Sequence, residues 1–214
     1  MILSCTLKPF LQHYYLKSRR PFRYKGLILA VEPGVFHPGL FFSSKILAKF
    51  ITQFNLTNKH LLDMGCGSGL LSLVAAEQGA KVVSADLNDL ALDNTRTNAQ
   101  SNGLDLTIVK SDIFNNITEQ FDYILVNPPY YPRKAKDAAG LAWYCGENFE
   151  YFRAFFNELS KHINQTSQVY MILSDGCALN TIGDIANEHQ FKMFIVHEQE
   201  GSLESSFIFR IERM

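Results

Sequence analysis

The sequence predicts an α/β fold: a doubly wound, mostly parallel, seven-stranded sheet with a C-terminal antiparallel hairpin. Three observations predict it. Short apolar runs alternate with helix-length segments from Lys59 onward, a glycine-rich loop follows the first run, and the last two runs are joined by a few residues around Gly201. With 214 residues, 47% of them hydrophobic, the chain has the length and apolar content of one globular domain.

Residues 1–56 are predicted to form a basic N-terminal arm that leads into a larger unit, residues 57–214. Residues 1–31 contain six Lys or Arg and no acidic residue. Within the arm we expect a helix over Thr6–Lys17, a strand over Tyr24–Glu32 that ends at Pro33-Gly34, and a helix over Ser43–Phe54. The aromatic residues among the basic ones either contact nucleic acid or an RNA-associated protein, or belong to a solvated edge, and the sequence leaves both interpretations open.

The larger unit is predicted to contain five buried parallel strands, at His60–Met64, Lys81–Ala85, Leu106–Val109, Tyr123–Val126 and Val169–Leu173. Helices are expected at Leu70–Gln78, Leu90–Asn102, Phe149–His162 and Leu179–His189. The final runs, Phe191–Glu198 and Ser205–Ile211, have so short a link that they must pair antiparallel.

Several classes of protein are disfavoured by composition. No apolar run approaches the roughly 18 residues that span a bilayer, and Met1–Phe10 lacks the pattern of a secretory signal. The four cysteines lie too far apart for a zinc or redox spacing. We therefore expect a cytoplasmic protein with reduced thiols, no bound metal and no contact with a membrane.

The loop Asp63-Met64-Gly65-Cys66-Gly67-Ser68-Gly69 lies between the first predicted strand of the larger unit and the following helix. Its glycines let a ligand lie against bare backbone. The third glycine of a dinucleotide fingerprint would fall at position 70, which is Leu70, so NAD is disfavoured. Asp63 would repel a pyrophosphate but suits a positively charged amine, such as that of S-adenosylmethionine (SAM). We predict that Asp63, Gly65, Cys66 and Gly67 bind SAM.

Two further aspartates end the next two predicted strands. Asp86, with Leu87 beside it, is placed to accept both ribose hydroxyl hydrogens. Asp112 is placed to accept from the adenine amino group, while Ile113 packs on the ring. Each aspartate alone is equally typical of a helix N-cap or a turn. Three acids at three successive strand ends favour the cofactor site.

The tetrapeptide Asn127-Pro128-Pro129-Tyr130 follows the fourth predicted strand of the larger unit. The prolines fix the backbone, so that the Asn127 amide oxygen and the Pro128 carbonyl can both accept hydrogen bonds from a planar NH2 group. Such a nitrogen is a poor nucleophile because its lone pair is conjugated. Two preplaced acceptors stabilise the positive charge that grows on it as it attacks a methyl group. We predict that Asn127 and Pro128 are catalytic, with Asn127 also at the cofactor, and that Pro129 and Tyr130 complete the substrate site, Tyr130 by stacking.

From Val31 onward the chain resembles the class I SAM-dependent methyltransferases that act on planar nitrogen. Asn127–Tyr130 and the later stretch Gly140–Glu147 are similar to the short-form release-factor glutamine methyltransferases. Pro33–Phe36 is similar instead to the ribosomal-RNA guanine methyltransferases, and the tetrapeptide also occurs in adenine methyltransferases of DNA and RNA. Unlike the short-form relatives, the segment Val35–Ser43 contains no acidic residue or threonine, so the resemblance does not imply the cofactor contacts that those relatives make from it.

The resemblance implies that residues 57–214 form a methyltransferase domain with SAM as cofactor. It implies a macromolecular substrate, methylated on a glutamine side-chain amide of a translation-related protein or, alternatively, on an exocyclic amine of adenine or guanine in RNA or DNA. It also leaves room for a small activating subunit, which some short-form relatives need. The interpretation from a different class is a non-catalytic module that binds SAM or RNA.

Overall fold

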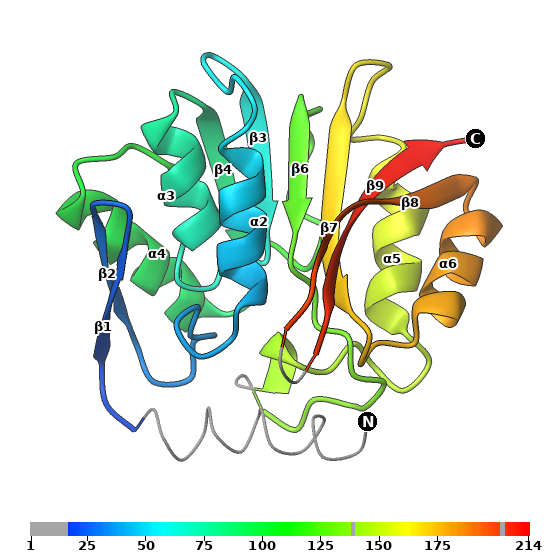
Figure 1. Ribbon diagram of the computed structural model, residues 1–214, viewed down its shortest axis with the longest axis horizontal. Coiled ribbons are helices and arrows are strands. Elements are labelled where there is room, and N and C mark those ends of the chain that lie inside the picture. The colour runs from blue at the N-terminus through cyan, green and yellow to red at the C-terminus, as the bar shows by residue number, and fades with distance from the viewer. Residues whose placement is uncertain (1–16, 138–139, 202–203) are drawn as a thin grey trace.

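The computed structural model describes residues 17–137, 140–201 and 204–214. Its main sheet has seven strands in the order β5-β4-β3-β6-β7-β9-β8 (Figure 1). The five parallel strands are β3 (His60–Met64), β4 (Lys81–Asp86), β5 (Thr107–Lys110), β6 (Tyr123–Val126) and β7 (Gln168–Ser174). Strand β9 (Ser206–Arg213) runs antiparallel to both β7 and β8 (Phe191–Gln199). The predicted doubly wound sheet with its C-terminal hairpin is confirmed.

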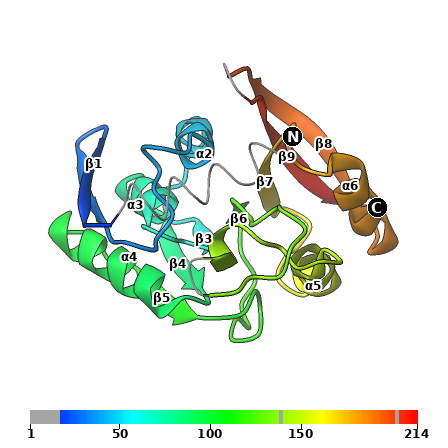
Figure 2. The same cartoon turned by 90° about the horizontal axis from the view of Figure 1, so that it is seen from below.

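Helices cover both faces of this sheet (Figure 2). The helices are α2 (Ser43–Ile51), α3 (Leu70–Glu77), α4 (Asp89–Ser101), α5 (Glu150–Leu159) and α6 (Leu179–Glu188), with a short 3-10 turn at Gly140–Ala142. Alternate residues of β6 belong to different core clusters: Ile124 packs with α5 and α6, and Leu125 packs with α2 and α3. None of the helices in the described ranges is long and apolar enough to cross a membrane.

The N-terminal region forms a separate two-stranded sheet of β1 (Arg20–Tyr24) and β2 (Leu27–Val31). The single strand predicted over Tyr24–Glu32 is therefore wrong at its start. Lys25 and Gly26 both have positive φ, 46° and 97°, which makes them the two-residue turn of a hairpin. The turn at Pro33-Gly34 is confirmed by the hydrogen bond from Val35 N to Glu32 O, 3.1 Å. Of the helix predicted over 6–17, all but Lys17 lies outside the described residues.

Helix α4 holds the second edge of β2 through three asparagines spaced four residues apart. The side-chain oxygens of Asn94, Asn98 and Asn102 accept from the backbone N–H groups of Glu32, Ala30 and Ile28 at 3.1, 2.8 and 3.0 Å. Their side-chain N–H groups donate back to the carbonyls of Ala30 and Ile28. Apolar residues of β2 also share a core cluster with α2 and β3. The division of the chain into 1–56 and 57–214 stays a prediction.

Candidate active site

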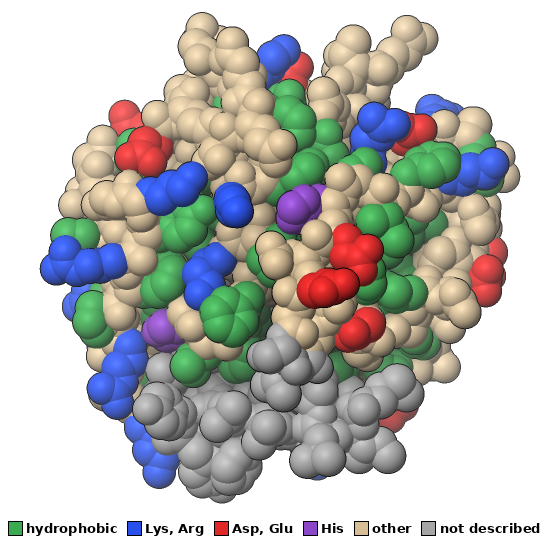
Figure 3. Space-filling model, viewed as in Figure 1, with side chains coloured by type: hydrophobic (Ala, Val, Ile, Leu, Met, Phe, Trp, Pro, Cys, Tyr) green, Lys and Arg blue, Asp and Glu red, His purple; other side chains and the backbone are tan. Residues whose placement is uncertain are grey.

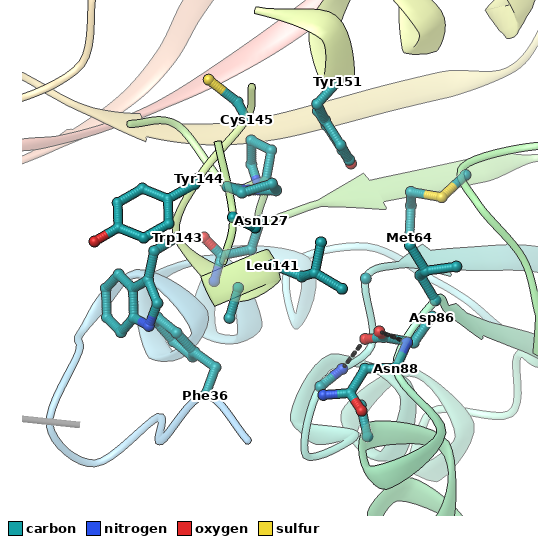
Figure 4. Close-up of a pocket in the computed structure, with 18 of the residues that line it drawn as sticks. Phe36, Met64, Asp86, Asn88, Asn127, Leu141, Trp143, Tyr144, Cys145 and Tyr151 are labelled. Carbon is teal, nitrogen blue, oxygen red and sulfur yellow. Dashed lines mark hydrogen bonds between the residues drawn. The ribbon is translucent and has the colours of Figure 1, made fainter. Parts of the chain in front are cut away.

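A cavity of about 710 Å³ lies at the carboxyl ends of the parallel strands, where the strand order reverses between β3 and β6. Open α/β sheets bind ligands at this position. Every predicted site residue except Asp63 lines it: Gly65, Cys66, Gly67, Asp86, Leu87, Asp112, Ile113, Asn127, Pro128, Pro129 and Tyr130. Figure 4 shows Met64, Asp86 and Asn88 on one side of the cavity and Asn127, Trp143 and Tyr144 on the other. What each residue binds stays a prediction.

The glycine loop turns sharply between β3 and α3. The backbone N–H groups of Gly65 and Cys66 both donate to Ala85 O, at 2.8 and 3.0 Å, and so fasten the loop to β4. Gly65 and Gly67 have φ values of 79° and 55°, a region that disfavours side chains. From α4, the Thr95 hydroxyl donates to Gly67 O at 3.0 Å. The loop therefore presents a fixed strip of bare backbone to the cavity.

Asp86, the last residue of β4, hydrogen-bonds to the same loop. One carboxylate oxygen accepts from Gly67 N at 3.0 Å and the other from Asn88 N at 2.9 Å. A carboxylate has about four acceptor positions, so each oxygen retains one for a ligand hydroxyl. Burial raises the pKa of Asp86, and the hydrogen bonds from Asn88 and Gly67 oppose that rise. This arrangement suits the predicted contact with a ribose.

Asp63 lies beneath the loop and does not line the cavity. One carboxylate oxygen, Oδ2, accepts from both the backbone N–H and the hydroxyl of Ser72, at 3.0 and 2.5 Å. The other, Oδ1, is buried and has no hydrogen-bond partner among the described residues. Burial raises the pKa of Asp63 to about 6. An unpartnered carboxylate oxygen under the glycine loop is consistent with a cationic amine bound above it, which fits SAM.

Asp112 and Ile113 border the cavity after β5. Ile113 has a φ of 50°, which is rare for a β-branched residue, and the Ser111 hydroxyl donates to its carbonyl at 2.8 Å. Backbone strain of this kind costs about 1–3 kcal/mol and is concentrated at functional sites. The strained turn keeps the exposed Asp112 and the half-buried Ile113 side by side on the cavity wall.

The Asn127 side chain is oriented by Ser44, a contact that the sequence analysis missed. Asn127 Nδ2 donates to Ser44 Oγ at 2.9 Å. Since the amide nitrogen is engaged there, the amide oxygen remains as the acceptor for a substrate. Ser44 is the second residue of α2, is 8% exposed, and lines the cavity. It lies 83 residues from Asn127 in the chain, so no sequence spacing pointed to it.

Aromatic side chains enclose the Asn127 side of the cavity. The ring of Trp143 lies 5.3 Å from that of Phe36 and 4.7 Å from that of Phe41, centroid to centroid. Phe36, which was not among the predicted site residues, also lines the cavity. Tyr130 packs edge-to-face on Tyr131 at 4.7 Å, and burial raises its pKa well above the usual value, which keeps its hydroxyl neutral. These flat rings suit a planar substrate group.

A basic surface lies on β1, the turn after it and α2, and comes nearest the cavity beside Ser44. It consists of Arg20, Arg23, Lys25, Lys45 and Lys49, none of which forms an ion pair within the described ranges. Figure 3 shows Lys and Arg side chains spread over the half of the molecule that carries β1, β2 and α2. Lys45, next to Ser44 in the chain, has its Nζ 4.0 Å from the ring centre of Phe42, which is 63% exposed.

Comparison with known proteins gives consistent matches. A putative protein N5-glutamine methyltransferase of Methanocaldococcus jannaschii is 38% identical over 109 residues, 50% of this chain and 53% of the relative. The T. thermophilus 16S rRNA methyltransferase in complex with AdoMet and guanosine has a TM-score of 0.67 at 19% identity, covering 92% of this chain and 50% of that one. The E. cuniculi Mtq2–Trm112 complex, responsible for methylation of the translation termination factor eRF1, has a TM-score of 0.64 at 21% identity. That match covers 85% of this chain and 99% of the other.

The chain spans about half the length of the curated relatives it matches first. The family model of the methyltransferase small domain matches residues 26–143, from β2 through the glycine loop and the Asn127 tetrapeptide to Trp143. That match covers more than half of the chain and includes all the predicted site residues. The chain therefore belongs to the methyltransferase small domain family.

Proposed function

We propose that this protein transfers a methyl group from SAM to the nitrogen of a planar NH2 group on a macromolecule. The observation that carries the proposal is the hydrogen bond from Asn127 to Ser44, which leaves the Asn127 amide oxygen as an acceptor at the cavity. The matches to a glutamine methyltransferase and to an rRNA methyltransferase that binds AdoMet support it.

The residues of the cavity suit the parts of SAM. The backbone of the glycine loop would hold the amino acid part, with the carboxylate of Asp63 beneath the loop attracting the positive charge of its amine. Asp86 and Leu87 would hold the ribose, and Asp112 and Ile113 the adenine. When bound, SAM supplies an electrophilic methyl group on a positively charged sulfur.

Asn127 and Pro128 would act on the nitrogen that receives the methyl group. By accepting its two N–H hydrogens they draw it away from planarity and free its lone pair for attack. One N–C bond forms as the S–CH3 bond breaks, and the nitrogen then loses one proton to water. Because positive charge develops on nitrogen only during transfer, the two acceptors stabilise the transition state more than the bound substrate.

Two acceptor classes follow from different observations. A glutamine amide of a translation-related protein is our first proposal, supported by the similarity to the N5-glutamine methyltransferase and to the complex that methylates eRF1. The latter complex also supports a small activating subunit as a partner. An exocyclic base amine in RNA is the second, supported by the basic surface on β1 and α2, whose side chains form no ion pair with other described residues, since phosphates attract such side chains.

The test compares Asn127→Ala with Asn187→Ala, a control at an exposed asparagine of α6. Each protein is incubated with tritiated SAM and cell extract, and the labelled fraction is digested with protease or nuclease to identify the acceptor class. Loss of one transition-state acceptor should lower transfer by about 100- to 1,000-fold, while the variant still binds S-adenosylhomocysteine (SAH). Transfer at the parental rate by Asn127→Ala would refute the catalytic role. Binding of SAH by the parent without transfer to any fraction would favour a non-catalytic module.

A further inference from the structure

The hydroxyl of Tyr151 is buried in the cavity wall without a partner. It and Asp63 Oδ1 are the two buried side-chain polar atoms in the described part of the chain that make no hydrogen bond. Tyr151 is the second residue of α5 and lines the cavity. A buried hydroxyl without a partner is costly, so a ligand that supplies the missing partner would recover that loss.

The ring of Tyr151 is fixed, which aims the hydroxyl. It packs edge-to-face on Phe152 at 5.5 Å and parallel to Phe155 at 6.4 Å, between ring centres. Figure 4 shows the side chain reaching from α5 toward the side of the cavity that holds Met64 and Asp86. Its hydroxyl therefore points toward the part of the cavity that these residues line.

The surroundings indicate which kind of atom the hydroxyl would meet. Burial raises the pKa of Tyr151, and the carboxylates of Asp86 and Asp112 are near enough to raise it further, so the hydroxyl keeps its proton and can donate. The two carboxylates can only accept, and they suit the hydroxyl and amino donors of an adenosine. The remaining polar atoms of the base are its unsubstituted ring nitrogens, which are acceptors.

We infer that Tyr151 is a further adenine-binding residue, whose hydroxyl donates to one of the two ring nitrogens that flank the amino group, N1 or N7. Asp112 would accept from the amino group itself, so the pair would recognise a donor and an adjacent acceptor on one edge of the base. The inference rests on the proposed function, because it requires the adenosine of SAM in this cavity.

The experiment measures by calorimetry the Kd of SAH and of its 1-deaza, 7-deaza and 3-deaza analogues. The variant Tyr151→Phe keeps the ring and removes the hydroxyl. Losing one neutral hydrogen bond should raise its Kd for SAH about 2- to 12-fold. For either the 1-deaza or the 7-deaza analogue, the Kd of the parent should be higher than its Kd for SAH by the same factor. Tyr151→Phe should bind that one analogue as tightly as it binds SAH. The 3-deaza analogue and the variant Tyr170→Phe, whose hydroxyl bonds Gln168 instead, serve as controls.

The outcomes separate this inference from the proposed function. If the parent binds SAH and Tyr151→Phe binds it equally well, the adenine contact is refuted while the proposed function stands. If the parent does not bind SAH, both fail. Because the variant removes an unpartnered buried hydroxyl, its unfolding temperature without ligand should be no lower than that of the parent. If Tyr151→Phe instead unfolds at a lower temperature and its Kd rises by the same factor for SAH and for all the analogues, the hydroxyl has a structural role and the inference is overturned.

Discussion

Replacing Ser44 by alanine tests how the reactive amide is oriented. The change removes the Ser44 oxygen that accepts the hydrogen bond from Asn127 Nδ2 at 2.9 Å. Ser44 is only 8% exposed, and alanine keeps a side chain of similar size there. Without this partner the amide can rotate and offer its NH2 group, which cannot accept a hydrogen bond from the substrate. One neutral hydrogen bond contributes about 0.5–1.5 kcal/mol, so we expect transfer to slow about 2- to 12-fold.

The assay follows tritiated methyl transfer at saturating SAM, with the Kd of SAH measured in parallel. Ser43→Ala is the matched control, since Ser43 precedes Ser44 on α2 but does not line the cavity. A positioning role predicts slower transfer at an unchanged Kd and a smaller loss than for Asn127→Ala. Parental transfer by Ser44→Ala, or a rise in the Kd of SAH that accounts for the whole loss, would contradict the reasoning.

Two further predictions concern stability. Since burial raises the pKa of Asp63 from the usual 3.8 to about 6, ionising it disfavours the folded state, and the parent loses stability relative to Asp63→Asn as pH rises through that range. Measured by urea titration, the free energy of unfolding of the parent relative to Asp63→Asn should fall by about 3 kcal/mol between acidic and neutral pH. A relative free energy that does not change with pH would contradict this prediction. Gly69→Ala would place a Cβ 2.9 Å from Leu73 Cδ1 at a φ of 83°, which we expect to cost about 2–4 kcal/mol. Gly103→Ala, also at positive φ but in open space, should cost only about 1 kcal/mol, and equal losses would rule out the steric argument.

The parallel strands could be predicted because each is a short apolar run bounded by loops, and β6, for example, matches its expected bounds of Tyr123–Val126. The N-terminal hairpin could not. Its turn places Lys25 at a φ of 46°, whereas two-residue turns of this kind favour Asn, Asp or Gly there. Without such a residue, the run from Tyr24 reads as one continuous strand.

The candidate site was predictable where its residues directly follow a strand. Asp86, Asp112 and Asn127 reach one cavity because parallel strands end at the same edge of the sheet. Ser44 and Tyr151 come from helices whose approach depends on tertiary packing, and no local pattern marks them. Figure 4 shows Asn127 and Tyr151 entering the cavity from different elements.

The asparagines of α4 are spaced four residues apart, and the residues of β2 that they bond are spaced two apart. Four residues of helix advance about 6.0 Å, while two residues of strand advance about 6.8 Å. The two repeats therefore differ by about 0.8 Å at each step and about 1.6 Å over two steps. All three hydrogen bonds nevertheless have lengths of 2.8 to 3.1 Å, so local bending and the reach of the side chains make up the difference. A single-residue deletion between two of these asparagines would turn the side chains beyond it by about 100° around the helix, away from β2, so the spacing of the three asparagines fixes where the hairpin meets α4.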